Sequence, residues 1–213
     1  MDNMFENCRT LNELDLSSFK TFSVVSMPKL FASCEKLKKI IITNFGTKNV
    51  QNMNLMFQNC EKLTSLDLSH FNTSNVRNFD NMFENCYDLA YLDVSSFNTS
   101  SAASMISMFH NCLLLTSIDV SNFKVENVKN MENLFGNYKA LKKVNVSNFK
   151  TVSALTFKSM FENCNSLISV DVSNFETENV SNMANMFRGC KKIASIDFSN
   201  FNTEEVINME YMF

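Results

Sequence analysis

Cysteine is the residue type in this chain with the greatest capacity for chemistry, and it recurs at multiples of 26 residues. The series consists of Cys8, Cys34, Cys60, Cys86, Cys112, Cys164 and Cys190, with Tyr138 in its one vacant place. A ladder of disulfides or metal ions is one interpretation. However, stacked side chains in register point in parallel, whereas a disulfide requires them to converge, and no His accompanies the series as a further metal ligand. We therefore predict buried, small apolar side chains with neither paired sulfur nor metal.

A carboxylate also recurs once in most repeats, two residues before a Ser. The acidic column contains Asp15, Asp67, Asp93, Asp119, Asp171 and Asp197, with Ile41 and Asn145 in the two remaining places. A calcium ladder is one interpretation, but calcium repeats use Gly-rich turns and several oxygen ligands per ion. We predict instead that the carboxylates accept hydrogen bonds from Ser on a solvated face. Where Asp is absent, the pairs Lys38–Lys39 and Lys142–Lys143 lie just upstream and should relieve repulsion within the column.

No catalytic constellation is recognisable in the sequence. The two histidines, His70 and His110, occupy unrelated phases of the repeat and lack a nucleophile or a third ligand, so we expect both at the surface. A Gly-rich phosphate loop, a metal-ligand spacing and a nucleophile elbow are all missing. The sequence therefore predicts a protein that is not an enzyme and uses no cofactor.

The Cys series and the acidic column belong to one sequence repeat that runs through the whole chain. Met-Phe returns every 26 residues, with Leu replacing Met in two copies, and its Phe falls at Phe5, Phe31, Phe57, Phe83, Phe109, Phe135, Phe161, Phe187 and Phe213. Such a period is typical of a solenoid, in which each unit buries its apolar face only by stacking on the next. We predict a single solenoid of about eight repeats over residues 1–213. Both ends lie at the same phase, so we expect an uncapped piece of a longer array.

Each repeat combines two apolar patterns. Residues 63–71 read L-x-x-L-x-L-x-x-F, which contains the alternation of a short strand. In residues 76–86 the apolar side chains follow at helical spacing. Thr73 or Asn75 would cap this helix at its start, and Asn85 tolerates the left-handed conformation of a helix end. The predicted fold class is an α/β repeat solenoid, with one parallel β-sheet on the concave face and short helices on the convex face. The Phe that ends each strand pattern, such as Phe97, should stack with its neighbours as a spine.

The string L-T-S-L-D-L-S-x-F-N-T-S-N-V-x-N-M-x-x-M-F-x-N-C resembles the repeat of BspA-like leucine-rich-repeat surface proteins, which include lipoproteins of mollicutes. The match covers the whole chain, with Phe where the leucine-rich repeat usually has Asn or Cys. The resemblance implies a right-handed, leucine-rich-repeat-like coil. It also implies a cell-surface or secreted protein, anchored elsewhere in the polypeptide, that mediates adhesion or interaction and has no catalytic residues.

Composition narrows the choice of partner. A net charge of −3 and a pI near 5.5 argue against nucleic-acid binding. No apolar run approaches the roughly 20 residues of a membrane span, and the segment shows no signal peptide. We expect a protein or glycan partner on a host or neighbouring cell, bound by outward strand residues that vary between repeats. The candidate contact residues are Asp67, Tyr91, Asp93, Asp119, Lys39 and Lys143.

Two other functions compete with this one. Because both ends share one phase of the repeat, arrays of this kind could stack end to end into filaments. Ice or mineral binding through the Ser and Thr columns is the third hypothesis, and the Asp column disfavours it because it interrupts a flat hydroxyl array.

Overall fold

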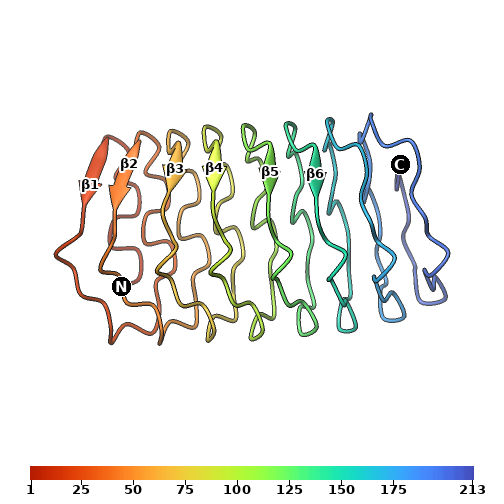
Figure 1. Cartoon of the computed structure of the whole chain (residues 1–213), viewed down its shortest axis with the longest axis horizontal. Helices are drawn as coiled ribbons and strands as arrows, with labels where there is room; N and C mark the ends of the chain where they lie inside the picture. The colour runs from red at the N-terminus through yellow and green to blue at the C-terminus, as the bar shows by residue number, and fades with distance from the viewer.

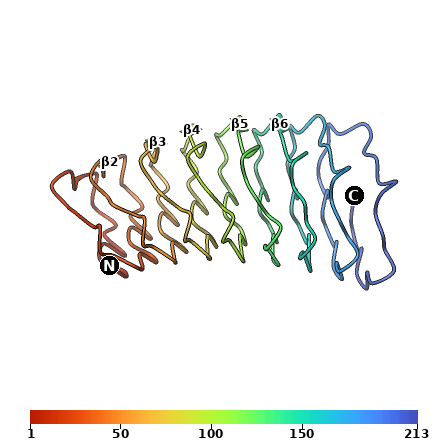
Figure 2. The same ribbon diagram turned by 60° about the horizontal axis from the view of Figure 1, so that its bottom comes forward.

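The computed structural model describes residues 1–213, which form one row of stacked coils, each about one repeat long (Figure 1 and Figure 2). Short strands line one side, here called the strand face. They are β1 (Glu13–Asp15), β2 (Lys39–Ile41), β3 (Ser65–Leu66), β4 (Tyr91–Leu92), β5 (Ser117–Ile118) and β6 (Lys143–Val144). Paired strands are parallel and one repeat apart in register, so that Ser65 lies beside Tyr91. The prediction of parallel strands in the L-x-x-L segment is confirmed.

The strands pair two by two, so the prediction of one continuous sheet is wrong. β1 pairs with β2, β3 with β4, and β5 with β6. A turn directly after β3 shows why the strands are short. The Oδ1 atom of Asp67 accepts a hydrogen bond from the backbone N–H of Ser69 at 3.0 Å. A side chain that bonds to the nearby backbone in this way competes with the ladder of a sheet.

The prediction of short helices is also wrong, because the segment opposite the strands is a series of turns, here called the turn face. In residues 76–86, Asn81 and Asn85 have φ values of 57° and 60°, and left-handed residues four positions apart are incompatible with an α-helix. Alternate N–H groups point along the array: Asn81 donates to the carbonyl of Ile106 in the next coil at 2.7 Å. The N–H groups between them close four-residue turns, as Met82 does by donating to the carbonyl of Phe79 at 3.2 Å.

The turn face carries the continuous ladder of the molecule. Its parallel bridges connect Ser26, Asn52, Asn78, Ser104, Asn130, Thr156, Asn182 and Asn208 in succession. Coils joined by backbone hydrogen bonds are spaced like strands, about 4.8 Å apart, and not like packed helices at about 8–10 Å. An array curves when one side is spaced more widely than the other, as helices packed opposite strands would be. Because the turn face has no helices, the predicted concave and convex faces do not form, and the coils stand in a nearly straight row (Figure 1 and Figure 2).

The Phe of the Met-Phe repeat forms the aromatic spine of the core. Consecutive rings stack with centroids 5.4–6.2 Å apart and planes within 19° of each other, from Phe5 to Phe213. The strand-ending Phe column, which we expected to form the spine, is largely buried, but within it only Phe149 and Phe175 stack, at 6.3 Å. The spine therefore lies under the turns, where the backbone ladder also runs.

Threonine connects neighbouring coils and does not cap helices. Thr99 is buried, its Oγ1 donates to the carbonyl of Lys124 at 2.9 Å, and the same oxygen accepts from the Lys124 N–H at 2.7 Å. The same pair of bonds recurs at Thr47, Thr73, Thr151 and Thr177. Val125 occupies this column in the fifth coil and cannot form either bond. We call this contact the threonine link.

The prediction of buried cysteines is confirmed for the five interior members of the series. Each of these thiols donates to a Phe carbonyl in the preceding coil, as Cys86 does to Phe57 at 3.2 Å. Burial raises the pKa of Cys34 to about 11, so this thiol stays protonated at neutral pH. Tyr138 is equally buried in the vacant place, but its hydroxyl has no hydrogen-bond partner.

Candidate interaction surface

The strand face brings three of the predicted contact residues together around one hollow. Tyr91 in β4 is 65% exposed, which makes it the large exposed aromatic side chain of this face. The residues one repeat away on either side, Ser65 and Ser117, are small. The hollow has a volume of about 300 Å³ and is lined by Ser65, Leu66, Asp67, Tyr91 and Asp93. The ring of Tyr91 therefore stands free of aromatic neighbours beside two carboxylates.

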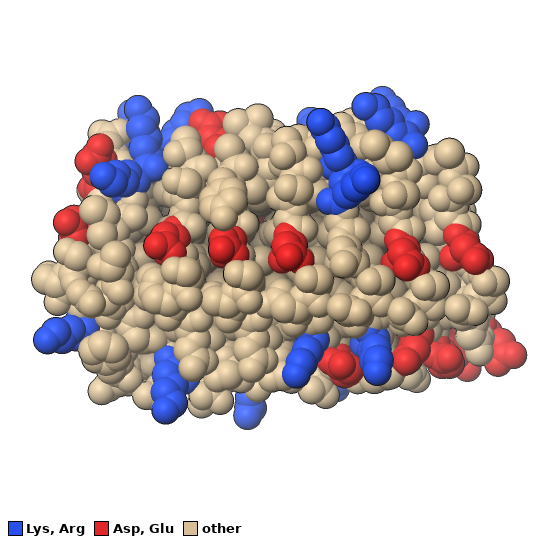
Figure 3. All heavy atoms as spheres, in the orientation of Figure 1, with Lys and Arg blue, Asp and Glu red and all other residues tan.

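The acidic column runs across the same face, where Figure 3 shows a row of acidic side chains with Lys and Arg toward the long edges. Every Asp of the column accepts a hydrogen bond through Oδ1 from the N–H of the Ser two residues later, at 2.8–3.0 Å. At Asp67 the Ser69 hydroxyl donates as well, at 2.7 Å. The prediction of Ser–Asp hydrogen bonding on a solvated face is confirmed.

These hydrogen bonds keep the carboxylates charged. The backbone N–H of Ser95, followed by its hydroxyl, lowers the pKa of Asp93, while the charges of Asp67 and Asp119 act in the opposite direction. The pKa of Asp67 is lowered chiefly by the hydroxyl and the N–H of Ser69. The column is thus anionic at neutral pH in spite of the repulsion between its members.

The other three predicted residues lie outside the hollow. Asp119 follows one coil beyond Asp93 and forms the same turn with Ser121. Lys39 in β2 pairs with Glu13, and Lys143 in β6 pairs with Ser117, so both lie in the column of Tyr91 but two coils away from it. Neither lysine forms an ion pair with the acidic column. Lys39 contributes only the last of the effects that lower the pKa of Asp15, after hydrogen bonds from Ser17.

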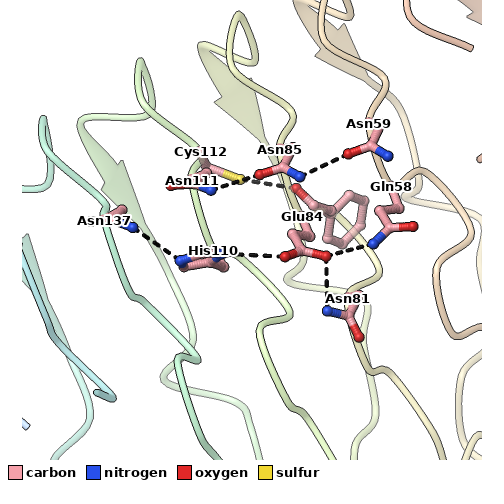
Figure 4. A network of polar contacts seen from close by, with 10 residues as sticks. Gln58, Asn59, Asn81, Glu84, Asn85, His110, Asn111, Cys112 and Asn137 are labelled. Atoms are coloured by element: carbon pink, nitrogen blue, oxygen red, sulfur yellow. Dashed lines mark hydrogen bonds and ion pairs between the residues drawn. The ribbon is translucent and has the colours of Figure 1, made fainter. Parts of the chain in front are cut away.

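A polar cluster on the turn face was not predicted (Figure 4). Glu84 accepts hydrogen bonds from Gln58 at 2.6 Å and Asn81 at 2.9 Å, and its Oε1 lies 3.3 Å from Nδ1 of His110. The other ring nitrogen of His110 contacts the Asn137 amide at 3.1 Å. The side chain of His110 is only 19% exposed, so the prediction of a surface histidine is wrong for it, whereas His70 is exposed.

The cluster stabilises a charged Glu84. Burial by itself raises the pKa of this carboxyl, but hydrogen bonds from His110, Gln58 and Asn81 outweigh burial, and the pKa is lowered. Amides of the column before Cys continue the network across coils, as Asn85 donates to Asn59 at 2.7 Å. A signal for the cluster was present, because Gln58, Glu84 and His110 are one period apart and must be neighbours in a stacked array.

Neither face offers a built metal centre. No three His, Cys, Asp or Glu side chains converge in an arrangement that would hold an ion. The structure also has no helix with the length and hydropathy of a membrane span. The arrangement on the strand face can contact another molecule through an aromatic ring and carboxylates, and that on the turn face holds coils together.

Among solved structures, the chain shows similarity to leucine-rich-repeat proteins. A leucine-rich-repeat protein of T. pallidum shares 17% identity over 92% of this chain and 71% of its own, with a TM-score of 0.47. A leucine-rich-repeat protein from Bacteroides ovatus shares 15% sequence identity over 97% of this chain and 76% of its own, with a TM-score of 0.34. A leucine-rich cell surface protein of Faecalibacterium prausnitzii shares 14% identity over 95% of this chain and 76% of its own, with a TM-score of 0.32. A comparison with curated proteins gave no match.

The sequence profile of one protein family matches the chain in two overlapping segments. The family is described as "Mycoplasma protein of unknown function, DUF285", and its profile matches residues 1–118 and again residues 108–213. This match confirms the resemblance to the repeats of mollicute proteins. Since the two matches together span the whole solenoid, the chain belongs to the DUF285 family of Mycoplasma proteins.

Proposed function

We propose that this solenoid is a non-catalytic interaction module, displayed on the cell surface or secreted, that binds a macromolecule on a host or neighbouring cell through its strand face. The observation that carries the proposal is the 65%-exposed ring of Tyr91 beside the hollow that Asp67 and Asp93 line. Aromatic side chains dominate the binding energy of many interfaces because they bury a large area with few rotatable bonds.

The difference between the two faces supports this assignment. On the turn face, polar side chains are engaged in contacts between coils, as Glu84 is with Gln58 and His110. On the strand face, the outward residues at the position of Tyr91 vary from coil to coil and are left free for a partner. They are Glu13, Lys39, Ser65, Tyr91, Ser117, Lys143, Ser169 and Ser195.

A role without catalysis is supported by the surroundings of the acid–base pair Glu84–His110. Amide side chains of Gln58, Asn81 and Asn137 occupy its hydrogen-bonding positions, and no hydroxyl or thiol nucleophile is bonded to it.

Attachment of the purified protein to intact host cells tests the proposal. The double variant Tyr91→Ala/Asp93→Asn should fold normally and lose attachment by tenfold or more. The matched control is Leu155→Ala, which removes a 49%-exposed apolar side chain next to the turn-face ladder and should leave attachment unchanged. Retained attachment in the double variant, together with loss in the control, would place the binding surface on the turn face and refute the proposal.

End-to-end stacking is the second candidate function. It is supported by the way the coils join, since neighbouring coils are connected by a continuous ladder of parallel bridges on the turn face. Every interior contact between coils is made by the same columns. Light scattering against concentration tests it: growth of the average mass without limit favours filaments, and a constant mass contradicts them.

A further inference from the structure

The chain contains its own example of a cation received by an aromatic ring and a carboxylate, which lie in the coils on either side of it. The guanidinium of Arg188 lies over the ring of Tyr211, 5.4 Å from its centroid. The same group reaches Oε1 of Glu162 in the preceding coil at 3.5 Å. A planar guanidinium suits both contacts, because it stacks on an aromatic face and donates to carboxylate oxygens.

The Tyr91 hollow presents the same set of groups without a cation from the chain. Tyr91 supplies an open ring, and Asp67 and Asp93 directly follow β3 and β4. These two strands pair in register, about 4.8 Å apart. In both carboxylates Oδ1 is engaged by the following Ser, and Oδ2 accepts no hydrogen bond from the protein. No Lys or Arg forms an ion pair with either of them.

The charges around the hollow favour a cationic partner over a neutral one. Asp119 adds a third carboxylate one coil away, and the two lysines in the column of Tyr91, Lys39 and Lys143, are each two coils away from it. The negative charge of Asp67 acts to raise the pKa of Asp93, in opposition to the hydrogen bonds from Ser95. A cation placed between the two carboxylates would relieve this repulsion. A hydroxyl group would not neutralise this charge.

We propose that the Tyr91 hollow binds an arginine side chain of a partner protein, with the guanidinium stacked on the ring and hydrogen-bonded to Asp67 and Asp93. This inference rests on the proposed function of the strand face and names the partner chemistry. The hollow is open and holds one side chain, so a single arginine binds weakly, and affinity comes from several contacts along the face.

The test is an NMR titration of the protein, with Tyr ring protons observed, using the peptide Ac-Gly-Arg-Gly-NH₂. The resonances of Tyr91 should shift, whereas those of Tyr211, which already holds Arg188, should not. The same peptide with citrulline, the uncharged isostere of arginine, should bind at least fivefold more weakly. Because exposed charges are screened within about 10 Å at 0.1 M salt, the apparent affinity should also fall as salt is raised.

Carboxylate variants with a matched control separate the role of the charge from that of the fold. Asp67→Asn/Asp93→Asn should weaken arginine binding at least fivefold. Asp171→Asn/Asp197→Asn should not, because these carboxylates lie in the same column but Ser169 and Ser195 occupy the position of Tyr91 there. The amide preserves the turn, since Asn145 already forms it by accepting from the Ser147 N–H at 3.2 Å and hydroxyl at 2.7 Å.

Three results would overturn the inference: equal binding of the citrulline peptide, equal loss in the control variant, or no shift of Tyr91. A shift of Tyr91 by the neutral trisaccharide cellotriose that persists in Asp67→Asn/Asp93→Asn would assign the hollow to glycans instead. In that case cell attachment would still require Tyr91, and the proposed function would stand. If attachment does not depend on Tyr91 at all, the proposed function itself fails.

Discussion

Replacing Thr99 by Val removes one threonine link without changing the shape of the side chain. The hydroxyl of Thr99 forms two hydrogen bonds to the backbone of Lys124, at 2.9 and 2.7 Å. With a net contribution of about 1 kcal/mol from each bond, we expect Thr99→Val to lower the free energy of unfolding by about 2 kcal/mol. Thr99→Ser keeps the hydroxyl and serves as a control for the loss of the methyl group.

Val125 provides the reverse experiment at the same position of the next coil. The N–H and the carbonyl of Lys150 have no partner within the protein, because Val125 lacks the oxygen that would bind them. Val125→Thr should therefore raise the free energy of unfolding by about 1 kcal/mol, less than the loss at Thr99 because the exposed backbone of Lys150 can already bond to water.

Urea unfolding followed by circular dichroism measures both changes. The midpoint should fall for Thr99→Val, rise for Val125→Thr and stay closer to that of the wild type for Thr99→Ser. A neutral Thr99→Val variant, or a Val125→Thr variant with a lower midpoint, would refute the idea that this hydroxyl joins neighbouring coils.

Three further predictions concern the core and the turn-face cluster. Phe83→Ala removes a ring stacked on both sides and should lower the free energy of unfolding by about 3–5 kcal/mol, as Phe97→Ala should. Cys86→Ala should lower it clearly less. If Cys86→Ala or reducing agent lowered the melting temperature more than the Phe variants do, this prediction would be contradicted. Tyr138→Phe removes a buried hydroxyl without a partner and should stabilise the protein by about 1 kcal/mol in urea unfolding; destabilisation would show that the hydroxyl is satisfied. Because the pKa of Glu84 is lowered in the folded protein, its charged form stabilises the fold fully above the ordinary pKa of 4.5, and this stabilisation is lost as the pH falls through the folded-state pKa. Glu84→Gln should therefore flatten the dependence of thermal stability on pH below 4.5. An unchanged slope would show that Glu84 does not cause that dependence.

The period of the sequence was sufficient to predict which residues lie side by side. Asp67, Tyr91 and Asp93 meet at one hollow because positions one repeat apart are neighbours and strand residues alternate between the core and solvent. The same rule applied to Gln58, Glu84 and His110 predicts the polar cluster. The two histidines by themselves give no sign of it, because they occupy unrelated phases of the repeat.

The conformation of the turn face could not be read from its apolar pattern. Turns that advance three or four residues bury Val76, Phe79 and Met82 as an amphipathic helix would, so the periodicity fits both structures. The distinguishing feature is the pair of left-handed residues in each coil. One of them falls on an Asn column, but the other is Lys29 in one coil and Leu55 in another, residue types that give no warning of positive φ.

The replacement of one threonine by Val125 has a mechanical consequence. In a solenoid each coil is held only by its neighbours, so a tensile load along the axis passes through every junction in series, and the weakest junction determines the strength of the whole. The coil that contains Val125 lacks the hydroxyl link to the next one, and it also carries the unsatisfied hydroxyl of Tyr138. We expect the array to part first at this junction when it is pulled from both ends, with intact blocks of coils on either side.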